Sequence, residues 1–257
     1  MQFWQRIEEP AQVLVAGASR GIGLALTTQL LERAEVAKVF AVARHAPASA
    51  DLLALQVRHG SRLQLLACDL RNEAAVAALA SQLLAQTARL HLLLCSVGIL
   101  QEDAARAEKS LTQLSLEGLM ASFNSNCFAP ILLLKHLLPL LRGKHPCSVA
   151  ALSARVGSIG DNRLGGWYSY RASKAALNQL LHTASIELKR LNPQSCVLSL
   201  HPGTTDTELS RPFQAKIAAD SLFSPEFAAR CLLQQVAEHG PEDSGSFWAW
   251  DGQQIPW

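Results

Sequence analysis

A short apolar run that enters a glycine-rich loop constrains the fold of this chain more than any other stretch. Residues 13–23 read V-L-V-A-G-A-S-R-G-I-G, and an apolar segment with helical spacing starts at Ile22. This order predicts a strand, a phosphate-binding loop and a helix. Gly17 allows the sharp exit from the strand, Gly21 lets the backbone approach a ligand, and Gly23 lets the helix pack closely on the strand.

The first amide groups of that helix would face an anion. The unpaired N–H groups and the dipole of a helix N-terminus favour a pyrophosphate, with Ser19 and Arg20 beside it in the loop. An ordinary tight turn between a strand and a helix is the alternative, because glycine-spaced motifs are weak in isolation.

The composition indicates one soluble domain over residues 1–257. Hydrophobic residues make up 49% of the chain and charged residues 17%, which permits a large core. The 23 basic and 21 acidic residues are dispersed, so neither a nucleic-acid interface nor a membrane anchor is expected. Six dispersed cysteines without metal-ligand spacing indicate buried thiols, no metal site and a reducing compartment. No signal peptide is visible, so we expect a cytoplasmic protein.

Apolar runs and amphipathic segments alternate along the chain. We expect strands at residues 13–16, 38–43, 62–67, 90–96, 147–152, 197–200 and 246–250. We expect helices from Ile22 and over residues 48–59, 72–86, 115–141, 167–191 and 225–239, with Pro130 and Pro139 kinking or dividing the fourth. The pattern predicts a single Rossmann-type, doubly wound α/β domain whose mainly parallel sheet carries helices on both faces.

Charged residues at two strand ends bear on the choice of nucleotide. The second strand ends at Arg44, where the adenosine ribose of a dinucleotide would lie. Together with Arg20, Arg44 suits a 2′-phosphate and favours NADP(H) over NAD(H), whereas solvated surface arginines are the alternative. Asp69, followed by Leu70, ends the third strand and would either bind an adenine amine or cap the next helix.

A tyrosine and a lysine on one helix face carry the chemical prediction. Tyr170 and Lys174 are four residues apart, so their polar ends can converge on one ligand. A nearby ammonium stabilises a phenolate and lowers its pKa, while Ser153 at the fifth strand end could donate to the same carbonyl oxygen. Asn126, within an apolar helix, is either a satisfied structural amide or part of a polar site.

These motifs, taken in order, resemble the short-chain dehydrogenase/reductase family over nearly the whole chain. Residues 153–178 and the ending F-W-A-W-D-G-Q-Q-I-P-W are similar to its C-factor and sniffer-like carbonyl reductase branch. The matching positions are Gly17, Gly21, Gly23, Asp69, Gly98, Asn126, Ser153, Tyr170, Lys174, Pro202, Gly203, Thr204 and Thr207.

The resemblance implies a role for each chemical group. Tyr170 would be the general acid and base, and Ser153 would polarise the carbonyl. Lys174 would hold the nicotinamide ribose and tune Tyr170, while Asn126 would anchor a water in a proton relay. The segment after Pro202 would contact the nicotinamide amide.

The chain departs from the family pattern in three places. Cys95-Ser96-Val97-Gly98 replaces the usual N-N-A-G, so the first asparagine, a structural and cofactor contact, is absent. The interval from the serine to the tyrosine is longer than in most members, which leaves Ser158 as a weaker alternative to Ser153. Tyr168 lies two residues before Tyr170, but only Tyr170 has a lysine four residues later.

We therefore expect an NADPH-dependent carbonyl reductase acting on a small-molecule ketone or aldehyde. The alternative is an NAD(P)-binding regulatory or signalling protein with little turnover. A homodimer or homotetramer could form through the helices at residues 115–141 and 167–191. His201 and the tryptophans Trp248, Trp250 and Trp257 are expected to be structural, and the loop over residues 208–222 is expected to cover the substrate pocket.

Overall fold

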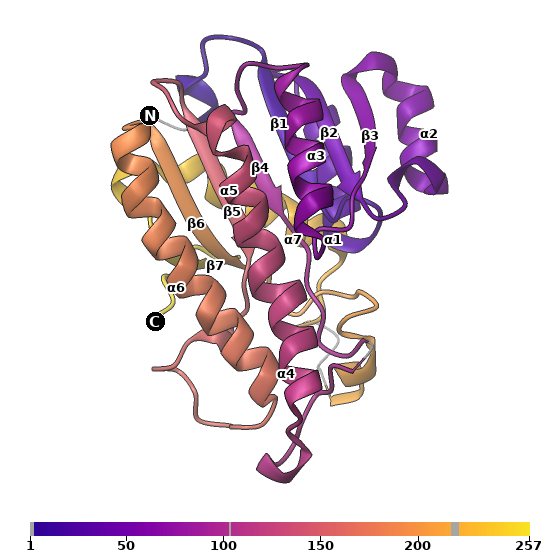
Figure 1. Cartoon of the computed structure of the whole chain (residues 1–257), viewed down its shortest axis with the longest axis vertical. Coiled ribbons are helices and arrows are strands. Elements are labelled where there is room, and N and C mark those ends of the chain that lie inside the picture. Colours follow the sequence, from indigo (N-terminus) through magenta and orange to yellow (C-terminus); the bar gives the residue numbers. More distant parts are fainter. Residues whose placement is uncertain (1–2, 103, 217–220) are drawn as a thin grey trace.

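Seven parallel strands form one sheet in the computed structural model, which describes residues 3–102, 104–216 and 221–257 (Figure 1). Their order across the sheet is β3-β2-β1-β4-β5-β6-β7. The strands are β1 (Ala11–Ala16), β2 (Val36–Ala43), β3 (Leu63–Ala67), β4 (Leu92–Cys95), β5 (Cys147–Leu152), β6 (Ser195–His201) and β7 (Ser246–Ala249). The order reverses between β1 and β4, which is where ligands bind in doubly wound folds.

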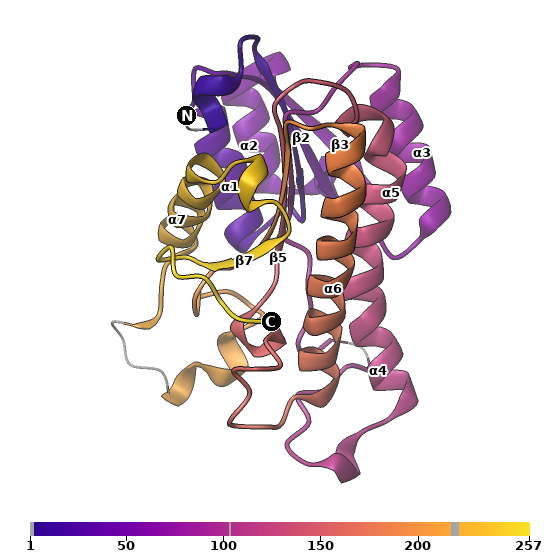
Figure 2. The same ribbon diagram turned by 90° about the vertical axis from the view of Figure 1, so that its left-hand side faces the viewer.

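Helices cover both faces of this sheet. They are α1 (Gly21–Leu31), α2 (Ala50–His59), α3 (Glu73–Leu84), α4 (Leu116–Phe123), α5 (Ala129–Leu141), α6 (Tyr168–Leu191) and α7 (Pro225–Glu238). Seen edge-on, the sheet has α1, α2 and α7 on one side and α3, α5 and α6 on the other (Figure 2). The predicted fold class is therefore confirmed.

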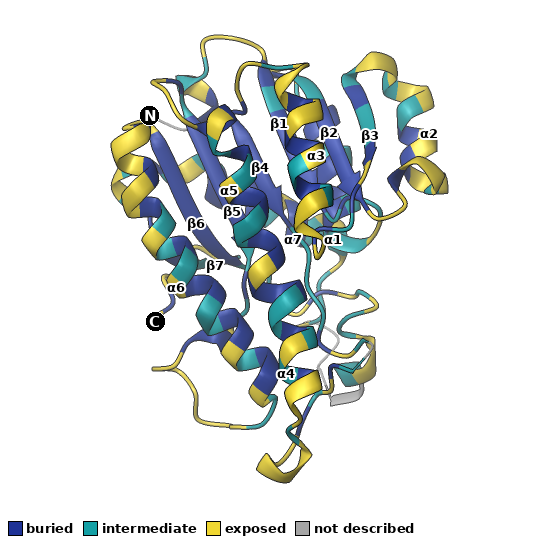
Figure 3. Cartoon of the chain, viewed as in Figure 1, coloured by how far each residue is buried: buried dark blue, intermediate teal, exposed yellow. Residues whose placement is uncertain are grey.

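Each face of the sheet has its own apolar core. Alternate residues of one strand belong to different cores, as with Val197 and Leu198 on β6. Strands buried on both faces need nearly continuous apolar sequence, which explains the short apolar runs (Figure 3). Within the described residues, no helix is long and apolar enough to cross a membrane.

The helix expected over residues 115–141 is divided near its middle. A π-helical turn, Asn124–Phe128, separates α4 from α5. Pro130 has no N–H to donate to the carbonyl of Asn126 four residues earlier, so the α-helical hydrogen bonds are interrupted here. At Pro139 the predicted division does not occur, because α5 continues through that residue to Leu141.

Candidate active site

A large cleft runs along the carboxyl ends of strands β1 to β6. Its volume is about 1280 Å³. Every residue predicted to hold the cofactor, and three of the four predicted catalytic residues, line it. These are Gly17, Ser19, Arg20, Gly21, Ile22, Gly23, Arg44, Asp69, Leu70, Gly98, Ser153, Tyr170, Lys174, Pro202, Gly203, Thr204 and Thr207. The fold therefore brings together residues that are far apart in the sequence.

The glycine loop is shaped by backbone contacts that a side chain would block. Gly17 and Gly21 have φ angles of 85° and 51°, in the left-handed region that favours glycine. A Cβ atom on Gly23 would overlap with the carbonyl oxygen of Gly17. The loop therefore packs directly against the first turn of α1, and its three glycines line the cleft.

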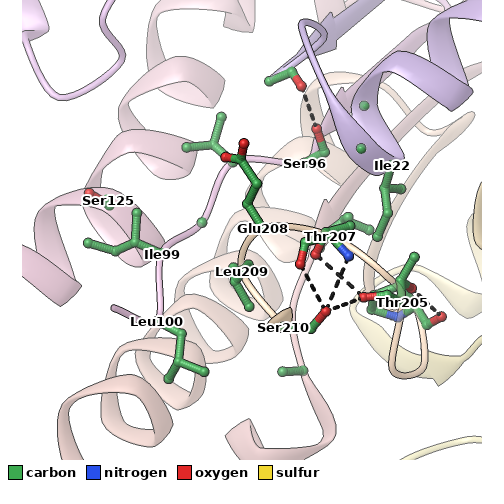
Figure 4. Close-up of a pocket in the computed structure, with 18 of the residues that line it drawn as sticks. Ile22, Ser96, Ile99, Leu100, Ser125, Thr205, Thr207, Glu208, Leu209 and Ser210 are labelled. Atoms are coloured by element: carbon green, nitrogen blue, oxygen red, sulfur yellow. Dashed lines mark hydrogen bonds between the residues drawn. The ribbon is translucent and has the colours of Figure 1, made fainter. Parts of the chain in front are cut away.

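Ser96 connects this loop to the end of β4. Its hydroxyl donates to the carbonyl of Ala16 at 2.8 Å, across the two central strands (Figure 4). Cβ atoms on Gly17 and Gly23 would lie 2.6 Å and 2.5 Å from the Ser96 Oγ atom. A small hydroxyl side chain therefore joins the strands where the family pattern has the second of its two asparagines.

Two arginines at the outer end of the cleft pair with carboxylates that the sequence reasoning missed. Arg44 contacts Glu102 at 3.3 Å, and Arg20 pairs with Glu208. Both glutamates come from loops, Glu102 after β4 and Glu208 after β6, and both also line the cleft. Their sequence separations from the arginines are 58 and 188 residues, so no local pattern could have indicated the pairs.

Asp69 is held by its neighbour Arg71. The carboxylate accepts from the guanidinium at 3.1 and 3.0 Å and from the Arg71 amide at 3.0 Å. These hydrogen bonds, with the charge of Arg71, keep the pKa of Asp69 below its usual value. The alternative of a helix cap at Asp69 is wrong, because Asn72 caps α3 by accepting from the Ala75 amide. Arg71 is a further cation of the cleft that the sequence reasoning missed.

The structure separates the two candidate serines. Ser153 is 3% exposed, lines the cleft, and its hydroxyl has no hydrogen-bond partner among the described residues. The Ser158 hydroxyl instead accepts from the Asp161 amide at 3.1 Å. A buried hydroxyl without a partner is costly unless a ligand or water satisfies it, which favours Ser153 as the donor.

Tyr170 and Lys174 are both buried on the first turns of α6. Tyr170 is 7% exposed and Lys174 is 2% exposed, whereas Tyr168 lies on the surface. The Lys174 Nζ atom lies 5.9 Å from the centre of the Tyr170 ring and donates to the Leu152 carbonyl at 2.7 Å. The structure therefore brings both groups to the end of β5, on one face of α6.

The pKa values of these two groups are governed by burial. Desolvation disfavours each charged form, so it raises the pKa of Tyr170 and lowers that of Lys174 to about 8. The neighbouring ammonium was expected to lower the pKa of the Tyr170 phenol. The pKa is instead raised, because burial of the phenol dominates. Lys174 remains charged at neutral pH and becomes neutral above its lowered pKa.

Asn126 lies behind the cleft rather than in it. Its side chain accepts from the Ile99 amide at 2.7 Å and donates to the Ile99 carbonyl at 2.8 Å and to Ser173 at 3.0 Å. This fully buried amide ties the loop after β4 to α6. These hydrogen bonds match the first of the two alternatives for Asn126, a structural amide whose hydrogen bonds are satisfied.

The loop after β6 closes one side of the cleft. The Ser210 hydroxyl is bonded to the backbone of Thr205 and Thr207 (Figure 4). The loop continues into Arg211–Lys216, where the ring of Phe213 lies 5.1 Å from that of Trp167. Both aromatic residues line the cleft. Of the predicted cover at 208–222, residues 217–220 lie outside the described part of the chain.

His201 lies closer to the site than the sequence indicated. It ends β6 and lines the cleft, and burial lowers its pKa to about 4, so its imidazole is neutral at pH 7. Within the described residues no cluster of metal-binding side chains occurs. The C-terminal tryptophans pack as expected, with Trp250 4.5 Å from Phe223 and Trp248 4.2 Å from His239 between ring centres.

Comparisons with known proteins agree with this geometry. A family model described as short chain dehydrogenase matches residues 11–218. The C-signal of Myxococcus xanthus is 34% identical over 137 residues, covering 53% of this chain and 76% of that protein. The carbonyl reductase Sniffer of D. melanogaster superposes with a TM-score of 0.84 at 25% identity, covering 97% of this chain and 100% of Sniffer.

A second structural neighbour was solved with a nucleotide. The NADPH-bound carbonyl reductase from chicken fatty liver superposes with a TM-score of 0.82 at 26% identity, covering 98% of this chain and 100% of that chain. The similarity to the C-factor and sniffer-like branch is thereby confirmed.

Proposed function

This chain belongs to the short-chain dehydrogenase/reductase family of NAD(P)-dependent oxidoreductases, and from that premise we propose that it is an NADPH-dependent reductase of small ketones or aldehydes. One observation carries the proposal. The buried hydroxyl of Ser153, which has no hydrogen-bond partner in the described part of the chain, lines the same cleft as the buried Tyr170 and Lys174. These three groups suit the polarisation and protonation of a carbonyl oxygen.

The described residues fit the nicotinamide cofactor. The amides around Gly21 and Gly23 would hold the pyrophosphate, because the loop has no room for a side chain at Gly23. Arg20 and Arg44 would hold a 2′-phosphate, and Lys174 would hold the nicotinamide ribose. Contact with the nicotinamide amide would come from residues 204–207. When bound, the nicotinamide supplies the hydride that reduces the carbonyl carbon.

The protein's own groups act on the oxygen. Ser153 donates a hydrogen bond to the carbonyl oxygen, and Tyr170 gives that oxygen a proton as it gains negative charge. The Lys174 ammonium stabilises the resulting phenolate, which burial otherwise disfavours. Asn126, together with Ser173, fixes the position of α6 relative to the loop after β4.

A second candidate is a cofactor-sensing signalling protein with little turnover. The similarity to the C-signal of Myxococcus xanthus favours it. Such a protein would bind NADPH in the same cleft, but its biological effect would not depend on Tyr170. The two candidates therefore predict different effects of removing the Tyr170 hydroxyl group.

Oxidation of NADPH by a panel of aromatic, aliphatic and quinone carbonyls tests the proposal, with NADH in parallel. We expect Tyr170→Phe to lower kcat by about a thousandfold, in the range typical of a lost general acid. Tyr168→Phe is the matched control and should retain activity, because its ring lies at the surface. Binding of NADPH without turnover of any carbonyl would favour the signalling candidate.

Self-association and location are further parts of this proposal. Leu116 and Met120 on α4 are 76% and 49% exposed, and Ile186 on α6 is 48% exposed, which supports a homodimer or homotetramer through these helices. Light scattering of the purified protein would measure the mass. The free cysteines, five of them buried, support a cytoplasmic location.

A further inference from the structure

Glu108 is a buried carboxylate that takes no part in the proposed reduction. Glu108 lies in the loop between β4 and α4 and is 2% exposed. Among the described residues it is the only aspartate or glutamate that is buried, and no described cation forms a salt bridge with it. A buried carboxylate is unfavourable unless hydrogen bonds satisfy its oxygens.

The first turn of α6 provides those hydrogen bonds. The Ser169 amide donates to one carboxylate oxygen at 3.3 Å, and the Ser169 hydroxyl donates to the other. The Trp167 amide donates to the Glu108 backbone carbonyl at 2.5 Å. Glu108 therefore holds both the residue that precedes α6 and the second residue of the helix.

The sequence of α6 offers no local substitute. Its N-cap residue is Trp167, whose indole cannot accept a hydrogen bond and makes no side-chain cap. Trp167 has a φ of 51° and is the only non-glycine residue with positive φ in the described part of the chain. A backbone conformation of this kind persists only where surrounding contacts fix it. Glu108 supplies the cap from 61 residues away.

The capped turn carries the proposed acid. Tyr170 follows Ser169 directly, and the ring of Trp167 packs edge-on to that of Tyr170 with 6.3 Å between centres. Movement of this turn would shift the phenol relative to Ser153, which is fixed on a different element, at the end of β5.

We propose that Glu108 is a positioning residue, a helix cap donated by a distant loop that fixes Tyr170 for proton transfer. The inference rests on the proposed reductase function for its catalytic part. Its structural part, the capping of α6, can be measured without turnover.

The experiment compares Glu108→Ala and Glu108→Gln with the wild-type protein. In Glu108→Gln the side-chain amide oxygen can still accept from the Ser169 amide, so this variant should retain the cap. Glu187→Ala, which removes an exposed carboxylate farther along α6, is the matched control. Hydrogen exchange of peptides covering residues 166–174 reports on the turn. NADPH binding sites are titrated so that kcat is expressed per intact site.

We expect Glu108→Ala to speed exchange in residues 166–174 by about tenfold and to lower kcat per site by about tenfold or more, since a misplaced acid slows the chemical step. The deuterium isotope effect on kcat with NADPH deuterated at the transferred position should rise in Glu108→Ala. Affinity for NADPH should stay unchanged, and Glu108→Gln should recover most of the exchange protection and kcat.

Two results would overturn the proposal. Unchanged exchange at residues 166–174 in Glu108→Ala would rule out the cap, whatever the activity. A fall in kcat per site with an unchanged isotope effect would rule out positioning of the acid. If the wild-type protein shows no carbonyl turnover, or Tyr170→Phe retains it, the reductase function and the catalytic part of this proposal are both rejected. Hydrogen exchange at residues 166–174 still tests whether Glu108 caps α6.

Discussion

The two ends of the cleft differ in how far their polar and charged groups are exposed to solvent. At the outer end, the side chains of Arg20 and Arg44 are 61% and 45% exposed, and each has a carboxylate partner. At the inner end, Ser153, Tyr170 and Lys174 are 3%, 7% and 2% exposed. The outer groups are exposed to solvent and already paired, whereas the inner groups are buried away from solvent.

This difference sets how much each residue can contribute. Exposed ion pairs are screened by solvent, and the 2′-phosphate of the proposed NADPH would compete with the carboxylate that each arginine already pairs with. Hydrogen bonds and charges in a dry site act more strongly and need no reorganisation. Substitutions at the inner end should therefore have larger effects than substitutions at the outer end.

After Tyr170, the largest effect is expected at Ser153. We expect Ser153→Ala to lower kcat/KM by about a hundredfold, as loss of one donor to a developing oxyanion does. Ser158→Ala should change kcat/KM by less than about twofold, because its hydroxyl serves the Asp161 amide. Steady-state NADPH oxidation measures both, and equal losses would contradict the assignment of the donor.

Next is the pH dependence that Lys174 imposes on stability. Burial lowers its pKa from 10.5 to about 8, which disfavours the buried ammonium by about 3 kcal/mol. Between these pH values the unfolded chain holds a proton that the folded protein has released. The free energy of unfolding should therefore rise with pH in this window, relative to Lys174→Met, which lacks the titrating group. Urea unfolding at several pH values measures the difference, and a flat difference would contradict it.

A smaller effect is expected from Arg44. Arg44→Ala should weaken NADPH binding by about tenfold and leave NADH binding unchanged, because only the phosphorylated nucleotide uses the guanidinium. Arg58→Ala, an equal change of charge at an exposed position on α2, is the control. Calorimetric titration with both nucleotides measures the ratio. Equal weakening of NADPH and NADH binding would show that Arg44 does not bind the 2′-phosphate.

The smallest effect is expected from the carboxylate that faces Arg44. Glu102→Gln should tighten NADPH binding by about threefold, because the phosphate no longer competes with an exposed ion pair. Glu35→Gln removes a carboxylate that pairs with Arg33 away from the cleft and should change nothing. Weaker NADPH binding in Glu102→Gln would show that the carboxylate supports the site instead of competing for Arg44.

Much of the site could be predicted from the sequence because its signals are local. Gly17, Gly21 and Gly23 sit in one loop, and Tyr170 and Lys174 are one helical turn apart, so spacing alone fixes their relation. The ends of the strands could be located from apolar runs, which placed a serine at the cleft after β5. The tie between the loop after β4 and α6 could not be predicted, because it depends on a contact between distant segments.

Alternating apolar runs and amphipathic segments, together with the glycine loop, determined by themselves the sheet, its two layers of helices and the edge where ligands bind. Those features depend on periodicity and on backbone sterics, which act between near neighbours. Only the tertiary structure decided that Ser153, rather than Ser158, lacks a hydrogen-bond partner among the described residues, which carboxylates face Arg20 and Arg44, and which loop caps α6. Each of these depends on groups separated by tens of residues or more, and their meeting is set by the packing of loops, which leaves no periodic trace in the sequence.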